Sequence, residues 1–216
     1  MPSFEIGRLL RAGTTGFIAG CAVSQFDAPA FGALVRAPVG PDYAVYGLIH
    51  DIHIDDDGLV RQLVTSDNVS DEVMKDNRER RIVPVEMSVL SVGYEQSGRI
   101  QHLLPPRPPL SLDRIFLCDD AELVRFSDAG RFGYFRHVLR AKDTPIGEIL
   151  AAHIQQVGAA HGIIPVLDWD GKDNARSHAR DGIISWKEAA TQELITLLRD
   201  DYPTLMSVLG ALGEVL

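Results

Sequence analysis

The chain has 216 residues and a formal net charge of −9, which favours a globular protein of one large or two small domains. The acidic surplus argues against a nucleic-acid binder, because such proteins gain most of their non-specific affinity by neutralising phosphates with Lys and Arg. No stretch reaches the roughly 18 apolar residues of a membrane span. Residues 1–5 also lack a basic segment followed by an apolar run, so we expect a cytoplasmic protein.

Short segments rich in β-branched and aromatic residues alternate with Gly and Pro in the first half of the chain. They predict β-strands over residues 5–12, 15–23, 33–37, 44–54 and 81–94. In the last of these, Val83, Val85, Met87 and Val89 alternate with other residues, as in a half-buried barrel strand. Strands this short, interrupted this often, are typical of a small antiparallel barrel or sandwich.

A proline-rich segment separates these strands from the rest of the chain. Residues 104–110 read LPPRPPL, a run that fits neither a helix nor a central strand and therefore predicts an extended connector. Residues 115–118 would be the final strand. Asp119, with Glu122 three residues later, has the capping-box pattern of a helix start. The change from strands to helices is therefore expected near residue 118.

The stretch of residues 6–52 and the proline-rich crossing before the last strand resemble the HAS-barrel, a small β-barrel named for its occurrence in HerA-type DNA translocases and rotary ATP synthases. The resemblance rests on GRLL at residues 7–10, GALVRA at 32–37 and VYGLIHDI at 45–52. It covers roughly residues 4–125 and implies a small N-terminal antiparallel β-barrel, which we place in residues 1–118. Together with the helical patterns that follow, we expect an α+β chain with a mainly α-helical region in residues 119–216. In those families the barrel belongs to an ATPase and builds the collar of a ring.

The ATPase motor itself has no counterpart in this sequence. The phosphate-binding loop GxxxxGK[ST] is absent, and the nearest glycine cluster, residues 13–16, is followed by no Lys and fits a hairpin turn. We therefore expect a non-catalytic interaction and assembly module that needs no cofactor and associates with a protein partner or with itself. The resemblance implies an accessory protein of a HerA-type DNA-processing ATPase system.

The second half of the chain reads as helices. Thr144 and Pro145 predict a helix start, with the hydroxyl as cap, and Ser185 predicts another. The last segment, residues 205–216, is strongly apolar. Its helical face either packs on its own domain or docks on a partner, and a docking face would consist of Leu205, Val208, Leu209 and Leu212.

One alternative function is a metal-dependent hydrolase. On a strand, Asp51, His53 and Asp55 would project from the same face, within reach of a shared cation. The same pattern is also that of any half-exposed strand that runs into an acidic turn. A second alternative is a nucleic-acid-binding barrel. It would need a basic face built from Arg8, Arg11, Arg36, Arg61 and residues 78–81.

Overall fold

The computed structural model describes residues 4–24, 29–54, 82–162 and 180–215, together with the single positions 65 and 70. Strands occupy the first half: β1 (Phe4–Ala12), β2 (Gly16–Ser24), β3 (Leu34–Gly40), β4 (Tyr43–Ile54), β5 (Ile82–Gln96), β6 (Arg99–Gln101) and β7 (Arg114–Leu117). These bounds confirm the predicted strands to within a few residues at their ends. Only the short β6 was not predicted.

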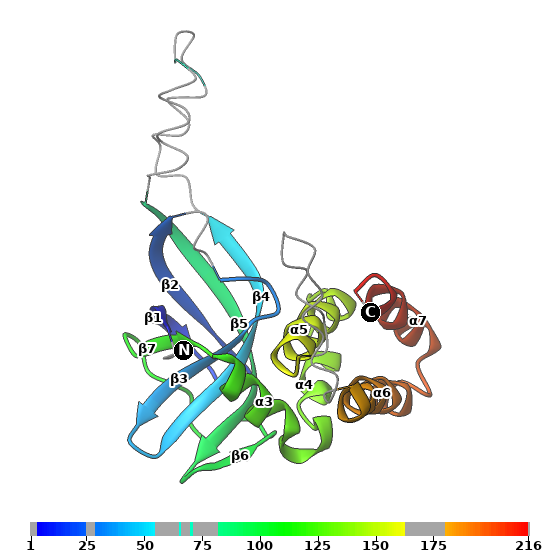
Figure 1. The fold of residues 1–216 in the computed structure, drawn as a ribbon. Helices are drawn as coiled ribbons and strands as arrows, with labels where there is room; N and C mark the ends of the chain where they lie inside the picture. The colour runs from blue at the N-terminus through cyan, green and yellow to red at the C-terminus, as the bar shows by residue number, and fades with distance from the viewer. Residues whose placement is uncertain are drawn as a thin grey trace.

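Six of these strands close into an antiparallel barrel (Figure 1). The hydrogen-bonded order is β2-β1-β7-β3-β4-β5, and β5 pairs back with β2 to complete the ring. β6 lies outside the ring, where it forms a hairpin with the end of β5. The predicted α+β class with an N-terminal barrel is therefore confirmed.

Alternation along β5 fills the barrel interior. Val85, Met87 and Val89 are buried, whereas Glu86 between them is exposed, as the valine-rich pattern predicts. Leu9 from β1 and Ile115 from β7 are fully buried in the same cluster. The long β5 therefore pairs with β2 and β4 while it lines the core with one face.

Helices follow the barrel. They are α3 (Asp120–Asp128), the short 3₁₀ segment η2 (Ala129–Phe132), α4 (Phe135–Leu139), α5 (Ile146–Ala160), α6 (Arg180–Leu197) and α7 (Tyr202–Gly213). The predicted capping box at the start of α3 is confirmed: the Asp119 carboxylate accepts from the Glu122 amide at 2.9 Å, and the Glu122 carboxylate accepts from the Asp119 amide at 3.3 Å. None of the helices in the described ranges has the length and apolar character to cross a membrane.

The helix start predicted at Thr144 and Pro145 is confirmed to within one residue, since α5 begins at Ile146, but the predicted hydroxyl cap is wrong. The start predicted at Ser185 is wrong. The Thr144 hydroxyl donates to the Lys142 carbonyl at 3.2 Å, and Pro145 occupies the N-cap of α5 without a side-chain hydrogen bond. The preceding Asp143 has a φ of 55°, so a tight turn at that residue directs Thr144 back along the chain. α6 begins at Arg180, before the predicted start at Ser185, because helix formation continues through Gly182 despite its poor propensity.

A second hydrophobic cluster, separate from the one that fills the barrel, joins the barrel to the helices. The helices gather on one side of the barrel (Figure 1), where Leu34, Tyr46 and Leu48 of the strands pack in a single cluster with the helical region. Phe126 of α3 stacks against Tyr46 with ring centroids 4.9 Å apart. A boundary between residues 1–118 and 119–216 therefore separates strands from helices, but the packing is continuous across it.

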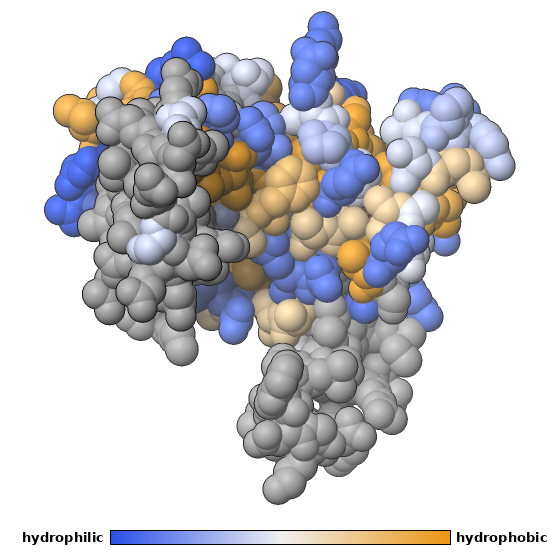
Figure 2. Space-filling model, turned by 90° about the horizontal axis from the view of Figure 1, so that it is seen from above, coloured by the Kyte–Doolittle hydropathy of each residue, from blue (hydrophilic) through white to orange (hydrophobic). Residues whose placement is uncertain are grey.

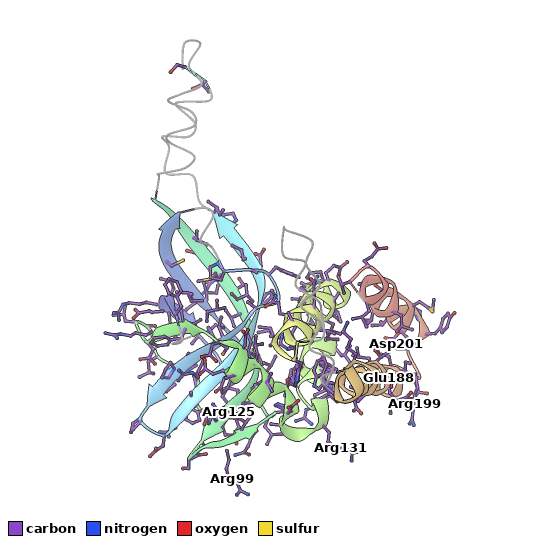
Figure 3. All side chains as sticks on the ribbon, in the orientation of Figure 1. Arg99, Arg125, Arg131, Glu188, Arg199 and Asp201 are labelled. Atoms are coloured by element: carbon purple, nitrogen blue, oxygen red, sulfur yellow. The ribbon has the colours of Figure 1, made fainter. Side chains whose placement is uncertain are left out.

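Polar contacts fix the helices on the barrel in addition to this core. The Arg125 guanidinium of α3, labelled in Figure 3, donates two hydrogen bonds of 2.8 Å to the Glu95 carboxylate of β5. The Tyr46 hydroxyl donates to the same carboxylate at 2.9 Å. The Arg125 guanidinium, the largest influence, holds the pKa of Glu95 below its usual range.

Replacing Glu95 by glutamine is expected to lower the free energy of unfolding by about 1 kcal/mol at neutral pH, because the paired, charged acceptor is lost from a partly solvated site. Glu188→Gln is the matched control, since Glu188 is exposed on α6 (Figure 3) and should leave stability unchanged. Urea unfolding of both variants measures the difference. Equal stability of the two variants would contradict a role for Glu95 in fixing α3.

Candidate functional site

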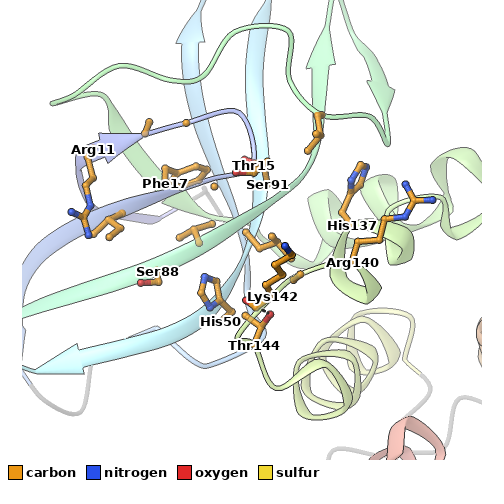
Figure 4. A pocket seen from close by; sticks show the side chains of 18 residues that line it. Arg11, Thr15, Phe17, His50, Ser88, Ser91, His137, Arg140, Lys142 and Thr144 are labelled. Atoms are coloured by element: carbon orange, nitrogen blue, oxygen red, sulfur yellow. Dashed lines mark hydrogen bonds between the residues drawn. The ribbon is translucent and has the colours of Figure 1, made fainter. Parts of the chain in front are cut away.

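A pocket of about 740 Å³ lies where the barrel meets the helical region (Figure 4). The β1–β2 hairpin, β4 and β5 provide one side, and the end of α4 with the loop into α5 provides the other. Small-molecule sites typically measure roughly 300–1,000 Å³, so the pocket has the size of a ligand site. Hydrophobic residues also gather between barrel and helices on the face shown in Figure 2.

Cationic side chains dominate the charged lining of this pocket. Arg11 extends from the end of β1, whereas Arg140 and Lys142 follow α4. In Figure 4, Lys142 lies between Arg11 on one side and Arg140 on the other. Among the described residues that line the pocket there is no Asp or Glu. Although the whole chain has a net charge of −9, the local positive charge of this pocket attracts anions to it.

Two histidines complete the polar lining. A register shift between Ile49 and Asp51 marks a bulge in β4, and His50 at this bulge lines the pocket. Burial lowers the pKa of His50, and burial followed by the nearby Arg136 and Arg140 lowers the pKa of His137. Both rings are therefore neutral at pH 7.

Hydroxyl groups line the pocket floor and walls. Thr15, Ser88 and Thr144 contribute three of them, and Ser91 of β5 contributes a fourth. Ser91 is fully buried, and its hydroxyl has no hydrogen-bond partner within the described structure. An unpaired buried hydroxyl costs about 1–3 kcal/mol, so a partner supplied by a ligand or water would stabilise this position.

The predicted metal residues lie elsewhere. Asp51 and His53 are both exposed on β4, and Asp55 falls outside the described residues. Within the described ranges, no group of three or more His, Cys, Asp or Glu side chains could hold a metal ion. Because the structure describes only two of the three predicted ligands, the metal site at Asp51, His53 and Asp55 stays a prediction.

The predicted docking face on α7 lies against the protein's own core. Val208 and Leu212 are buried, and Leu205 and Leu209 are partly buried against the same cluster, where α7 packs on α5. A partner could reach Val208 and Leu212 only if α7 moved away from α5, whereas Leu205 and Leu209 are partly accessible as they stand. The role of the four side chains in docking stays a prediction. In this structure, they pack against the protein's own core.

The basic face proposed for nucleic acid is divided in the structure. Arg36 pairs with Glu122 at 2.9 Å, and Arg8 pairs with Glu5 at 3.8 Å. Arg11 lines the pocket, whereas Arg61 and residues 78–81 fall outside the described ranges. The described part of this set therefore forms no continuous basic surface of unpaired arginines.

A second surface, which sequence patterns did not indicate, carries exposed leucines. It consists of Leu10 on β1 with Leu110 and Leu112 in the turn before β7, and we call it the leucine surface. Their exposed fractions are 49%, 64% and 71%. The Leu112 amide donates to the Leu9 carbonyl at 2.8 Å, and the Ser111 hydroxyl donates to the Leu10 carbonyl at 3.2 Å, so the turn lies directly on β1.

No protein-family model matches the chain, and no curated protein matches it. The function is therefore inferred from the geometry and chemistry of the described residues.

Sequence reasoning missed the pocket because its charged residues come from separate segments. Arg11, His50 and Lys142 are far apart in the chain and share no motif spacing. One local signal was present: Arg140 and Lys142 stand together just before a helix. From sequence alone, Arg140 and Lys142 look like an ordinary solvated segment. Only the closed barrel shows that β1 and β4 lie beside them.

Proposed function

We propose that the chain is a non-catalytic assembly module that associates with a second copy of itself through the leucine surface. The observation that carries this proposal is Leu112. Its backbone has a φ of 71°, in the left-handed region that bulky residues avoid, and its side chain is 71% exposed. Neither the strain nor the exposure gives the isolated chain any stabilisation.

The strained backbone is held in place by specific contacts. Besides the Leu112 amide on Leu9, the Arg8 guanidinium donates to the Leu112 carbonyl at 3.1 Å. The left-handed conformation costs a non-glycine residue about 1–2 kcal/mol, and glycine would adopt it freely. A leucine kept at such a place is best explained by a contact that its side chain makes outside this chain.

The charges around the leucine surface suit a second copy. Glu5 pairs with Arg8 at 3.8 Å and with Arg114 at 3.6 Å, and all three side chains are substantially exposed. A rim that carries both signs around exposed leucines can pair with its own copy, as symmetric interfaces require. The resemblance to the HAS-barrel supports the same association, because those barrels build collars, and it suggests a HerA-type DNA-processing ATPase system as the setting.

Leu112→Gly should abolish self-association and raise the free energy of unfolding by up to about 1 kcal/mol, because the change removes both the contact and the strain. Light scattering of the full-length protein over a wide concentration range measures the mass, and urea unfolding measures stability. A full-length protein is needed, since truncation after Cys118 would expose Leu34, Tyr46 and Leu48 of the shared core.

Leu197→Asp is the matched control, because Leu197 is exposed at the end of α6, away from the leucine surface. This variant should assemble as the unmodified protein does. A monomer at every concentration, or an oligomer that Leu112→Gly leaves intact, would refute self-association through this surface. If the protein is a monomer at every concentration, a different protein would be the expected partner of the leucine surface.

A further inference from the structure

The pocket between barrel and helices has the features of a ligand site that is separate from the leucine surface. Three basic side chains, Arg11, Arg140 and Lys142, line it without a carboxylate among the described lining residues. Arg36 of β3 and Arg125 of α3, in contrast, pair with Glu122 and Glu95. The positive charge of the pocket is therefore available to bind an anion from solution.

Hydrogen-bond donors inside the pocket point to an oxyanion. The Ser91 hydroxyl is fully buried and without a partner in the described structure, although its backbone amide donates to the Thr15 carbonyl at 3.0 Å. Ser88 adds a further hydroxyl to the lining, whereas the Thr144 hydroxyl already donates to the Lys142 carbonyl. A phosphoryl group has three terminal oxygens that accept from cations and hydroxyls together.

The remaining lining is apolar. Phe17 and Val89 are buried side chains that border the pocket, and Leu104 adds a partly exposed one. A free inorganic ion would leave most of the 740 Å³ volume to water and these walls without contact. The ligand is therefore expected to carry an apolar or aromatic body beside its anionic group.

We propose that this pocket binds a small organic phosphate, with Lys142 at the phosphoryl group, Ser91 donating to one of its oxygens, and the apolar walls holding the organic part. Arg11 and Arg140, on either side of Lys142 in Figure 4, add to the positive potential of the pocket. The charge favours a phosphate over a carboxylate, because three cations match a dianion better than a single negative charge. The site does not depend on self-association, so it stands whether or not the leucine surface binds a second copy.

The first test is calorimetric titration of the full-length protein with phenyl phosphate, benzoate, inorganic phosphate and benzyl alcohol. Phenyl phosphate should bind saturably at one site, about tenfold more tightly than benzoate or inorganic phosphate, and its affinity should fall with added salt. Benzyl alcohol should not bind. Benzoate as tight as phenyl phosphate would overturn the phosphoryl assignment, and inorganic phosphate as tight would overturn the role of the apolar walls.

Variants then locate the site. Lys142→Ala should weaken phenyl phosphate about three- to tenfold, a size typical of one charge-assisted contact at a solvated site. Arg11→Ala should weaken it less, because Arg11 acts on the phosphoryl group through the potential of the pocket and not by contact. Arg99→Ala is the control, because Arg99 is exposed at the β5–β6 hairpin and points away from the protein in Figure 3. An equal loss in Arg99→Ala would mean that binding follows overall charge and would refute the site.

Ser91→Ala separates binding from folding. Removing an unpaired buried hydroxyl should leave the melting temperature unchanged or raise it, while phenyl phosphate binding weakens several-fold. An unchanged or higher melting temperature together with a lower affinity is expected only if the Ser91 hydroxyl is unpaired in the free protein and paired in the complex. Unchanged affinity in Ser91→Ala would show that the ligand does not reach the pocket floor.

Discussion

Replacing Gly32 by alanine is expected to lower the free energy of unfolding by about 3 kcal/mol, because strain and overpacking act at one position. Gly32 has a φ of 77°, and a β-carbon there would lie 2.7 Å from the Ala152 β-carbon and 3.0 Å from the His153 backbone nitrogen of α5. The clash is with a helix backbone, which cannot give way like the end of a side chain. The melting temperature should fall by about 6–12 °C.

Gly98→Ala is the matched control for this experiment. Gly98 has the same φ of 77° in the β5–β6 hairpin, but nothing lies within 4 Å of the position of its β-carbon. It should therefore lose only the conformational part, about 1 kcal/mol. Thermal unfolding of both variants isolates the cost of the close approach. Equal losses would mean that α5 does not lie this close to the barrel in solution.

The second large effect is expected from His153, a fully buried histidine of α5. Its Nδ1 lies 3.2 Å from the Gly32 carbonyl, and its Nε2 lies 3.2 Å from the Tyr134 hydroxyl. A carbonyl only accepts, so Nδ1 carries the proton and Nε2 accepts from Tyr134. The neutral ring satisfies both contacts, and burial lowers the pKa of His153 to about 4.

Stability is therefore expected to depend on pH through His153. The unfolded chain binds this proton near pH 6.5 and the folded protein only near pH 4, so the stabilisation is complete above pH 6.5 and declines as the pH falls through this window. The loss amounts to about 3 kcal/mol at pH 4. Burial also lowers the pKa of His102 and His137, which act in the same direction.

Comparison with His153→Gln isolates the contribution of this one ring. The variant should be less stable at pH 7, because it loses the contact with Tyr134, but its stability should decline less between pH 6.5 and 4. Urea unfolding across this range would therefore give two curves that converge at low pH. Parallel curves, or an NMR titration that gives His153 a pKa near 6.5, would contradict a neutral buried ring.

The strands were predictable because their signals are local. Alternating valines in β5 and the glycines and prolines between strands follow directly from backbone preferences, and the capping box of Asp119 and Glu122 is confirmed for the same reason. The end of the barrel and the start of the helices could thus be placed from sequence alone. The barrel itself was expected from the resemblance, but the strand order that closes it was not predicted, since it depends on β1 pairing with β7, far along the chain.

The candidate site was not predictable, and the reasons are physical. His50 lines the pocket at a register shift in β4, a feature that its sequence does not announce. The same strand suggested Asp51 and His53 as metal ligands, because acidic residues and histidines on an exposed strand face give the same sequence pattern with or without a bound cation. Nothing in the sequence distinguished Leu112 from other loop residues; its left-handed backbone and its exposure are visible only in the structure.

Closure of the barrel through β1 and β7 has a consequence for synthesis of the protein. Arg114, where β7 begins, is made 102 positions after Ala12, where β1 ends (114 − 12). At about 5–20 residues per second, roughly 5–20 s pass between the two strands. During that interval the emerging chain holds Ile6 and Leu9 of β1 without the strand that covers its free edge. Until residue 114 is made, the sheet therefore stays open along β1, and apolar side chains that the closed barrel buries remain accessible.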